Sequence, residues 1–212
     1  LQELKNTMAL LDKFKLDDHV AIVTGAGKGI GAGIARALAE AGADVVLAAR
    51  TESDLQGVAE DIRALGRHAL VVPTDVLDFS QLQNLADLAL KEFGRIDILV
   101  NNAGGFPPKP VAHTTAKQFE DAFRFNVSTA FEMSRICAPI MVETSGGGNI
   151  LNISSIAGHK PAPCFAGYGT AKGALSILTQ QLAQEFAPKV RVNAIAVGST
   201  KTDALNAVLT PE

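Results

Sequence analysis

The chain has 212 residues, of which 47% are hydrophobic and 19% charged, and its formal net charge at pH 7 is -3. This composition suits one domain with a substantial core, and the slight acidic excess offers no basic surface for nucleic acid. No apolar run approaches the roughly 18 residues of a membrane span, and the first residues lack the basic-then-apolar order of a signal peptide, so we expect a single cytoplasmic domain over residues 1–212 that binds neither nucleic acid nor a membrane.

Predicted strands and helices alternate along the chain. Residues 1–16 form a short extension in which apolar side chains near helical spacing predict an extra helix. Apolar, β-branched runs then predict strands at 20–23, 44–48, 68–72, 96–100, 149–153 and 190–195. Helical spacing predicts helices at 30–41, 53–65, 80–93, 115–142 and 168–186.

The strand runs lack polar alternation, which is typical of parallel strands buried on both faces of a sheet. Crossovers between parallel strands are right-handed, and they place helices on both faces. The sequence therefore predicts a doubly wound, Rossmann-like α/β domain with a parallel sheet.

A glycine-rich turn follows the first predicted strand, where residues 24–31 read Thr-Gly-Ala-Gly-Lys-Gly-Ile-Gly and a helix begins. Glycines let the backbone turn tightly and approach a pyrophosphate, whose charge is met by amides at the helix N-terminus. The spacing Gly-x-x-x-Gly-x-Gly differs from the general Gly-x-Gly-x-x-Gly fingerprint. Its place between a first strand and a first helix favours dinucleotide binding over a merely tight loop.

Tyr168 is the only tyrosine of the chain, and Lys172 follows it within a predicted helix. Side chains four residues apart lie on one face of a helix. A fixed ammonium near a phenol favours the phenolate, so this pair is a candidate proton donor and acceptor at neutral pH. Alone, a Tyr and a Lys four residues apart are more often an amphipathic surface pair than a catalytic one.

Several motifs together carry a family resemblance. Residues 101–104 read Asn-Asn-Ala-Gly after the fourth predicted strand, Asn126 lies on the next helix, and Ser155 follows the fifth strand. With the glycine turn and the Tyr-x-x-x-Lys pair, these motifs resemble the short-chain dehydrogenase/reductase family from about residue 20 onward. Residues 97–105 and 202–205 are similar to those of bacterial 3-oxoacyl carrier-protein reductases and 7α-hydroxysteroid dehydrogenases.

The resemblance implies a catalytic set. Tyr168 is implied as the general acid on the carbonyl oxygen, Ser155 as a hydrogen-bond donor to that oxygen, and Lys172 as the group that stabilises the phenolate and holds the ribose. Asn126 is implied to hold a water that links Lys172 to solvent. Taken singly, Ser155 is better explained as a strand-end turn residue and Asn126 as a helix-interior polar group bonded to backbone. Together with Tyr168 and Lys172, the catalytic interpretation is favoured for both.

Cofactor choice is read at the end of the second predicted strand. Ala49 replaces the acidic residue that binds a ribose 2′-hydroxyl, whereas Arg50 and Lys28 provide positive charges for a 2′-phosphate. We therefore expect NADP(H), with NAD(H) as the alternative; a surface Arg50 that merely starts the next helix is the competing interpretation. The positions assigned to cofactor binding are Gly25, Lys28, Gly29, Ile30, Gly31, Arg50, Thr51, Asp75, Val76, Asn102, Ala103, Gly104, Tyr168, Lys172, Gly198, Thr200 and Thr202.

Two departures from the family pattern concern the end of the chain. Residues 197–198 read Val-Gly where the family usually has Pro-Gly, which predicts a looser turn beside the nicotinamide. The sequence stops at Glu212, where relatives continue into a last helix and strand. We expect either that this part of the family fold is lacking or that the protein continues beyond Glu212 into it.

The substrate is a small carbonyl or alcohol compound on this resemblance. Phe106, Pro161, Pro163 and Phe165 predict an apolar pocket for a 3-oxoacyl thioester or similar ketone, with a steroid as the alternative; ordinary loop packing explains these residues equally well. A dinucleotide-binding redox sensor or structural subunit is the non-enzyme alternative. The family relation implies a homotetramer or homodimer assembled through helices 115–142 and 168–186.

The cysteines and histidines give no pattern for a metal site. Cys137 and Cys164 have neither metal-ligand spacing nor a disulfide pattern, and we expect both to be small buried or half-buried side chains. The histidines are scattered without carboxylate or cysteine neighbours at ligand spacing. His159, between Ser155 and Tyr168, is read as a solvated loop residue, with substrate contact as the alternative.

Overall fold

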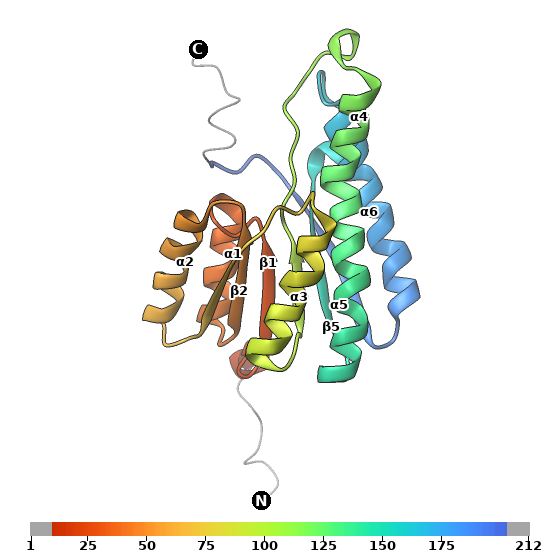
Figure 1. The fold of residues 1–212 in the computed structure, drawn as a ribbon. Helices are drawn as coiled ribbons and strands as arrows, with labels where there is room; N and C mark the ends of the chain where they lie inside the picture. Colours follow the sequence, from red (N-terminus) through yellow and green to blue (C-terminus); the bar gives the residue numbers. More distant parts are fainter. Residues whose placement is uncertain (1–9, 203–212) are drawn as a thin grey trace, which may run out of the picture.

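The computed structural model describes residues 10–202. They form a six-stranded parallel sheet in the order β3-β2-β1-β4-β5-β6, flanked by helices (Figure 1). The strands are β1 (Val20–Thr24), β2 (Asp44–Ala49), β3 (Ala69–Pro73), β4 (Ile98–Asn101), β5 (Gly148–Ser155) and β6 (Val190–Val197). The doubly wound architecture is as predicted, and the strand order reverses between β1 and β4, the point at which such sheets bind ligands.

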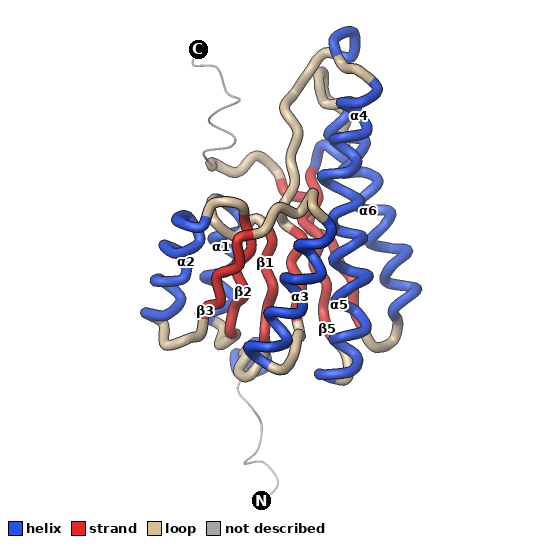
Figure 2. Tube along the Cα trace, in the orientation of Figure 1, coloured by secondary structure: helices blue, strands red, loops and turns tan. Residues whose placement is uncertain are grey.

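The helices divide between the two faces of the sheet (Figure 2). They are α1 (Gly29–Glu40), α2 (Glu52–Ala64), α3 (Phe79–Phe93), α4 (Ala116–Phe123), α5 (Thr129–Ser145) and α6 (Ala166–Phe186). One apolar core lies between the sheet and α1 and α2, and the other between the sheet and α3, α5 and α6. Within residues 10–202, no helix is long and apolar enough to cross a membrane.

Helix α1 packs closely on the sheet because its buried side is made of very small residues. Its buried positions are Gly31, Ala32, Ala35 and Ala39. The alanines pack against Ala21, Val23 and the neighbouring strand β2 in the same core. The first turn of α1 is thereby held directly beyond the end of β1, where the glycine-rich turn lies.

The predicted helix 115–142 is wrong as a single element. The structure has α4, then a π-helical turn at Arg124–Ser128, then α5. Thr115 closes a capping box at the start of α4 with Gln118, which explains where the helix begins. The π turn inserts an extra residue into the helical repeat, and apolar spacing alone does not reveal such an insertion.

The sequence also overstated the burial of the last strand. Strands β1 and β4 are buried throughout, but β6 is exposed from Asn193 to Ala196, and half of the Ile195 side chain is accessible. Strand β6 is the outer strand of the described sheet, and α1 and α2 cover the opposite end of that face. In the extension, the described part is a short 3₁₀ helix, Leu10–Phe14, whose Phe14 is exposed; residues 1–9 lie outside the described range.

Candidate active site

Nearly all of the predicted site residues lie at one edge of the sheet. The glycine turn follows β1, Arg50 follows β2, Asp75 follows β3, residues 102–104 follow β4, and Ser155 ends β5. These are the carboxyl ends of parallel strands, at the upper edge of the sheet in Figure 2. The edge is where open α/β sheets bind their ligands.

The glycine turn is a backbone cradle that side chains would fill. A Cβ atom on Gly31 would lie 2.2 Å from the carbonyl oxygen of Gly25, and Gly25 itself has φ +65°. Gly29 has φ +54°, and a Cβ atom there would lie 3.2 Å from Cγ2 of Thr202, so the segment after β6 returns to the turn. The turn leads directly into α1, so unpaired amides at the start of this helix face the cradle, an arrangement that suits a pyrophosphate.

Thr24 and Asn102 fasten the ends of β1 and β4 together. The Thr24 hydroxyl donates to the carbonyl oxygen of Val100 (3.3 Å) and accepts from the amides of Asn102 (3.0 Å) and Ala103 (3.1 Å). The Asn102 side chain donates to the carbonyl oxygens of Thr24 (2.9 Å) and Gly25 (3.2 Å). The sequence predicts cofactor binding for Asn102 and assigns no role to Thr24, whose buried hydroxyl fixes the floor of the cradle.

The predicted phosphate-binding cations differ in their surroundings. Arg50 is exposed and has no hydrogen-bond or ion-pair partner within residues 10–202. Lys28 instead pairs with Asp54 at 3.1 Å between Nζ and Oδ2, a partner that the sequence interpretation did not anticipate. A Cβ atom on Gly27 would lie 3.0 Å from Cβ of Asp54, so this carboxylate sits beside the turn. Arg50 therefore carries the available positive charge at the end of β2.

Three further predicted cofactor residues, Thr51, Asp75 and Val76, lie just after β2 and β3. Thr51 is the N-cap residue of α2, and Val76 is buried. Asp75 accepts from the amide of Leu77 (3.0 Å), and its own amide donates to Gln81 Oε1 (2.8 Å). These bonds fix the turn after β3.

Lys172 is buried directly behind Tyr168. Its ammonium donates to the carbonyl oxygen of Ile153 at 2.7 Å, and the side chain is 4% exposed. Burial lowers the pKa of Lys172 from 10.5 to about 8. Nζ lies 5.8 Å from the centre of the half-buried Tyr168 ring, and the Phe165 ring meets that ring edge-on at 6.0 Å. The Tyr-x-x-x-Lys pair is thus an interior pair at the edge of the site.

The π turn presents Asn126 to the loop after β4. Its side-chain amide donates to the carbonyl oxygens of Gly105 (3.0 Å) and Ala122 (2.8 Å), and its Oδ1 accepts from the Gly105 amide (2.9 Å). A Cβ atom on Gly104 would lie 2.7 Å from this Oδ1 and 3.1 Å from Nζ of Lys172. Gly104 therefore packs between Asn126 and Lys172, and the backbone-bonded interpretation of Asn126 holds in this structure.

Ser155 is oriented by the turn that follows it. Its Oγ accepts from the amide of Ala157 at 3.2 Å and caps a 3₁₀ turn at Ile156–Gly158. The side chain is 8% exposed. No acceptor for its own hydroxyl hydrogen lies within residues 10–202, so this hydrogen remains for a ligand oxygen.

A buried polar network that sequence reasoning missed supports these residues from below. Asn101 donates to Asn152 Oδ1 (2.9 Å) and to Ser134 Oγ (3.2 Å). Asn152 donates to Thr179 Oγ1 (2.9 Å), which donates to the carbonyl oxygen of Leu175 (2.8 Å). The network joins β4, β5, α5 and α6. The signal was an asparagine in each of two neighbouring strands, Asn101 at the end of β4 and Asn152 inside β5.

The segment after β6 contains three predicted cofactor residues, Gly198, Thr200 and Thr202. Gly198 and Thr200 are exposed, and the Thr200 hydroxyl lies 3.5 Å from the Gly198 carbonyl oxygen. Thr202 reaches Gly29, as described above. Residues 203–205 of the predicted similarity lie outside the described range.

The two cysteines differ from each other. Cys137 is buried, and burial raises its pKa to about 12. The expectation of at least partial burial is wrong for Cys164, which is exposed and has φ +67° in the loop before Tyr168. Its carbonyl oxygen accepts from the Lys109 amide at 2.8 Å, a bond that holds the loop tip in place.

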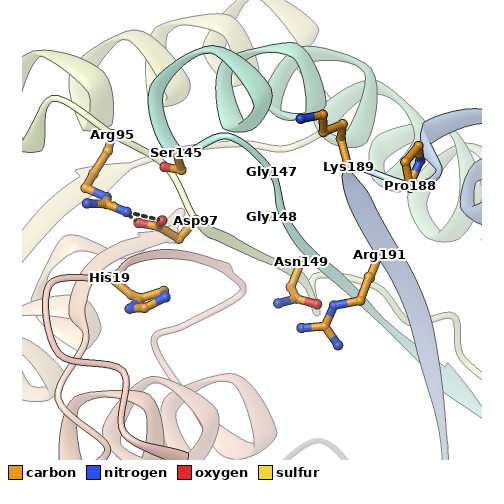
Figure 3. A pocket seen from close by; sticks show the side chains of 10 residues that line it. All are labelled: His19, Arg95, Asp97, Ser145, Gly147, Gly148, Asn149, Pro188, Lys189 and Arg191. Atoms are coloured by element: carbon orange, nitrogen blue, oxygen red, sulfur yellow. Dashed lines mark hydrogen bonds and ion pairs between the residues drawn. The ribbon is translucent and has the colours of Figure 1, made fainter. Parts of the chain in front are cut away.

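A polar hollow lies at the opposite, amino-terminal edge of the sheet (Figure 3). Its volume is about 280 Å³, and His19, Lys189 and Arg191 line it beside a bidentate pair between Arg95 and Asp97 with distances of 2.9 and 2.7 Å. Asp97 also accepts from the Val20 amide (2.8 Å), so the pair ties β1 to β4. None of the predicted site residues lines this hollow.

Comparisons with known proteins agree with this geometry. The short chain dehydrogenase family model matches residues 19–212. An uncharacterized oxidoreductase of Mycobacterium tuberculosis (strain CDC 1551 / Oshkosh) is 50% identical over 199 residues, covering 94% of this chain and 76% of that protein. 7α-Hydroxysteroid dehydrogenase of Escherichia coli (strain K12) is 42% identical over 202 residues, covering 95% and 78%.

A solved structure of 7α-hydroxysteroid dehydrogenase, complexed with NADH and 7-oxo glycochenodeoxycholic acid, has a TM-score of 0.92 and 40% identity to this chain. The match covers 96% of this chain and 80% of that one. Together with the glycine cradle and the Tyr-x-x-x-Lys pair on α6, these matches show that the chain belongs to the short-chain dehydrogenase/reductase family of oxidoreductases.

Proposed function

We propose that the protein is an NADP(H)-dependent oxidoreductase that transfers a hydride between the nicotinamide and an extended apolar ketone or its secondary alcohol. The observation that carries this proposal is the burial of Lys172 against the Ile153 carbonyl oxygen, with Gly104 and Asn126 on one side and Tyr168 one helical turn away. Burying an ammonium costs stability, and groups buried at such a cost are concentrated at functional sites.

The chain's own residues supply positioning and proton transfer, whereas the nicotinamide, when bound, supplies or accepts the hydride. Tyr168 protonates the carbonyl oxygen during reduction, and the unused hydroxyl hydrogen of Ser155 is donated to the same oxygen. Lys172 holds the ribose and favours the phenolate of Tyr168. Asn126 acts through Gly104 and Gly105, whose backbone it fixes beside Lys172.

The preference for NADP(H) rests on the end of β2. Ala49 carries no charge there, and Arg50 has no partner within the described residues. Lys28 contributes less, because Asp54 already neutralises it. We expect Arg50→Asp to shift the ratio of the Kd values for NADPH and NADH toward NADH by about tenfold or more, because a charge-assisted phosphate contact is lost. An unchanged NADPH/NADH ratio of Kd values would contradict the preference.

The substrate side is apolar. Phe106 lies against the start of α6, because a Cβ atom on Gly167 would lie 3.5 Å from its ring, and Phe165 packs on Tyr168. Ile156 is 41% exposed beside Ser155. A steroid-like ketone suits this surface, and the 42% identity to 7α-hydroxysteroid dehydrogenase supports it. A 3-oxoacyl thioester is the second candidate, because its apolar acyl chain would contact the same side chains.

The first test is a titration with NADPH and NADH followed by the cofactor's own fluorescence, since the chain contains no tryptophan. Steroid ketones and 3-oxoacyl thioesters are then compared as substrates. Tyr168→Phe is expected to lower kcat by about a thousandfold while the Kd of NADPH stays within twofold. Equal turnover by Tyr168→Phe would remove the proposed acid, and failure to bind either nucleotide would support a non-catalytic role.

We further propose assembly as a homotetramer or homodimer through α4, α5 and α6. Exposed apolar side chains on these helices support this arrangement: Phe119, Phe131, Val142 and Ile177. Light scattering tests it, and a monomer at micromolar concentration would contradict it.

A further inference from the structure

The loop between Ser155 and Tyr168 is anchored at both ends. At its start, Nε2 of His159 lies 3.2 Å from the Ser176 hydroxyl on α6. At its end, the Cys164 carbonyl oxygen accepts from the Lys109 amide at 2.8 Å. Residues 160–163 between the anchors are exposed. The His159 anchor is made by side chains, whereas the Cys164 anchor is made by the backbone. His159 immediately follows the turn that orients Ser155.

The turn at Ile156–Gly158 lies directly on the backbone of α6. A Cβ atom on Gly158 would lie 2.6 Å from the amide nitrogen of Gly173, and one on Gly169 would lie 2.7 Å from the carbonyl oxygen of Ala157. No side chain separates the turn from the helical segment that carries Tyr168 and Lys172. The position of Ser155 relative to Tyr168 therefore depends on how firmly this contact is held.

A chain of hydroxyl groups continues from His159 into the helix. Ser176 Oγ lies 2.9 Å from Ser154 Oγ and 3.1 Å from the Lys172 carbonyl oxygen, to which Ser154 donates at 2.9 Å. Ser154 and Ser176 have one hydroxyl hydrogen each. More of these contacts can therefore be hydrogen bonds when Nε2 of His159 donates to Ser176 than when it accepts from Ser176. Both the neutral Nε2–H form and the imidazolium have this donor.

We propose that His159 is a positioning residue for the reaction: its ring fastens the turn that orients Ser155 onto the segment of α6 that carries Tyr168. The bond keeps the Ser155 hydroxyl and the Tyr168 phenol aimed at one substrate oxygen. It does not reach the glycine-rich turn after β1, so we expect its loss to lower turnover more than it weakens nucleotide binding. This inference rests on the proposed function, because the aligned groups are those of the proposed reaction.

The test compares His159→Leu, which has no donor, with His159→Gln, whose amide retains one. His113→Leu is the matched control, since His113 is also exposed, at the end of the 3₁₀ helix Val111–His113, and its side chain forms no bond within residues 10–202. We expect His159→Leu to lower kcat for the ketone by about tenfold or more, with the Kd of NADPH within twofold, and His159→Gln to recover most of the loss. Ser176→Ala should match His159→Leu, and the double variant should lose no more.

A second readout does not need turnover. Tyr168 is the only tyrosine and there is no tryptophan, so the intrinsic fluorescence of the protein reports on Tyr168 alone. Acrylamide should quench this emission more strongly in His159→Leu than in the wild type, His159→Gln or His113→Leu. Wild-type quenching and wild-type kcat in His159→Leu would overturn the proposal, as would equal losses in the Leu and Gln variants. A wild type without turnover would instead count against the proposed function, and the quenching comparison would still decide the role of His159.

Discussion

Strands β1 to β3 with α1 and α2 bury almost only apolar side chains, whereas β4 and β5 with α5 and α6 bury a series of polar ones. The first core consists of alanine, valine, leucine and isoleucine. Asn101, Asn126, Asn152, Ser155 and Lys172 are all less than 9% exposed in the second region. The two regions meet between β1 and β4, where the Thr24 and Asn102 bonds cross the sheet.

The difference follows from what each region has to hold. A pyrophosphate is bound by backbone amides, so the first region needs only tight packing and glycines where the backbone approaches. Proton transfer requires side chains at fixed positions, and each polar side chain buried for this purpose needs a partner of its own. The first region is therefore most sensitive to added side-chain volume, whereas the second is most sensitive to the loss of a hydrogen bond.

The sharpest test of the first region is Gly31→Ala. Its new methyl group would meet the Gly25 carbonyl oxygen at 2.2 Å, so the turn must open, and we expect the Kd of NADPH to rise by about 100-fold. Gly33→Ala is the matched control, because a Cβ atom there meets nothing within 4 Å. It should leave binding unchanged and stabilise α1 by up to about 1 kcal/mol. Equal binding by the two variants in a fluorescence titration would show that space in the turn is not limiting.

Asn152→Leu tests the second region. It removes one hydrogen-bond partner from each of Asn101 and Thr179, and both side chains remain buried. We expect the free energy of unfolding in urea to fall by about 2 kcal/mol. Asn101→Leu should cost less in the Asn152→Leu background than in the wild type, because one of its partners is already gone. Fully additive losses would mean that the two asparagines act independently.

We expect Lys172→Met to change the free energy of unfolding least, and the sign of this change to depend on pH. The folded-state pKa of Lys172 is about 8 against 10.5 for the ordinary group, so burial of the charge costs stability in full below pH 8. Between these values the unfolded state binds more protons, and the stability of the wild type rises with pH. Lys172→Met removes the buried charge but also the hydrogen bond to the Ile153 carbonyl oxygen. We therefore expect the variant to be about 1 kcal/mol more stable than the wild type at pH 7 and less stable than the wild type near pH 10.5. Denaturant unfolding at both pH values measures this, and a constant difference would contradict it.

Local patterns in the sequence were sufficient for the architecture and placed the predicted site residues on elements whose ends meet at one edge of the sheet. Apolar runs predicted every strand within two residues at each end, and the glycine turn and the Tyr168–Lys172 pair lie on the predicted elements. Each of these signals is contained within a few neighbouring residues, where the periodicity of strands and helices acts directly.

The features that sequence reasoning missed depend on contacts between distant residues. Asn101 and Asn152 meet because β4 and β5 pair in a particular register, and Lys28 meets Asp54 only after α1 and α2 have packed. His159 meets Ser176 across the packed turn. The exposure of β6 likewise depends on which helices cover it. None of these follows from spacing along the chain, because the sheet and helix packing decide them.

The π turn at Arg124–Ser128 also determines where the outer loop of the site lies. Helix α4 beyond the turn carries Gln118, whose Oε1 accepts from the ammonium of Lys109 at 2.9 Å, and Lys109 holds the tip of the opposite loop at Cys164. Deleting one residue from the turn would merge α4 and α5 into one regular helix and rotate α4 by about 100° about its axis. Gln118 would then face away from Lys109. The contact between α4 and the Lys109 loop therefore depends on the phase between α4 and α5, and single-residue insertions or deletions at this turn are a way to move that loop without altering Ser155, Tyr168 or Lys172.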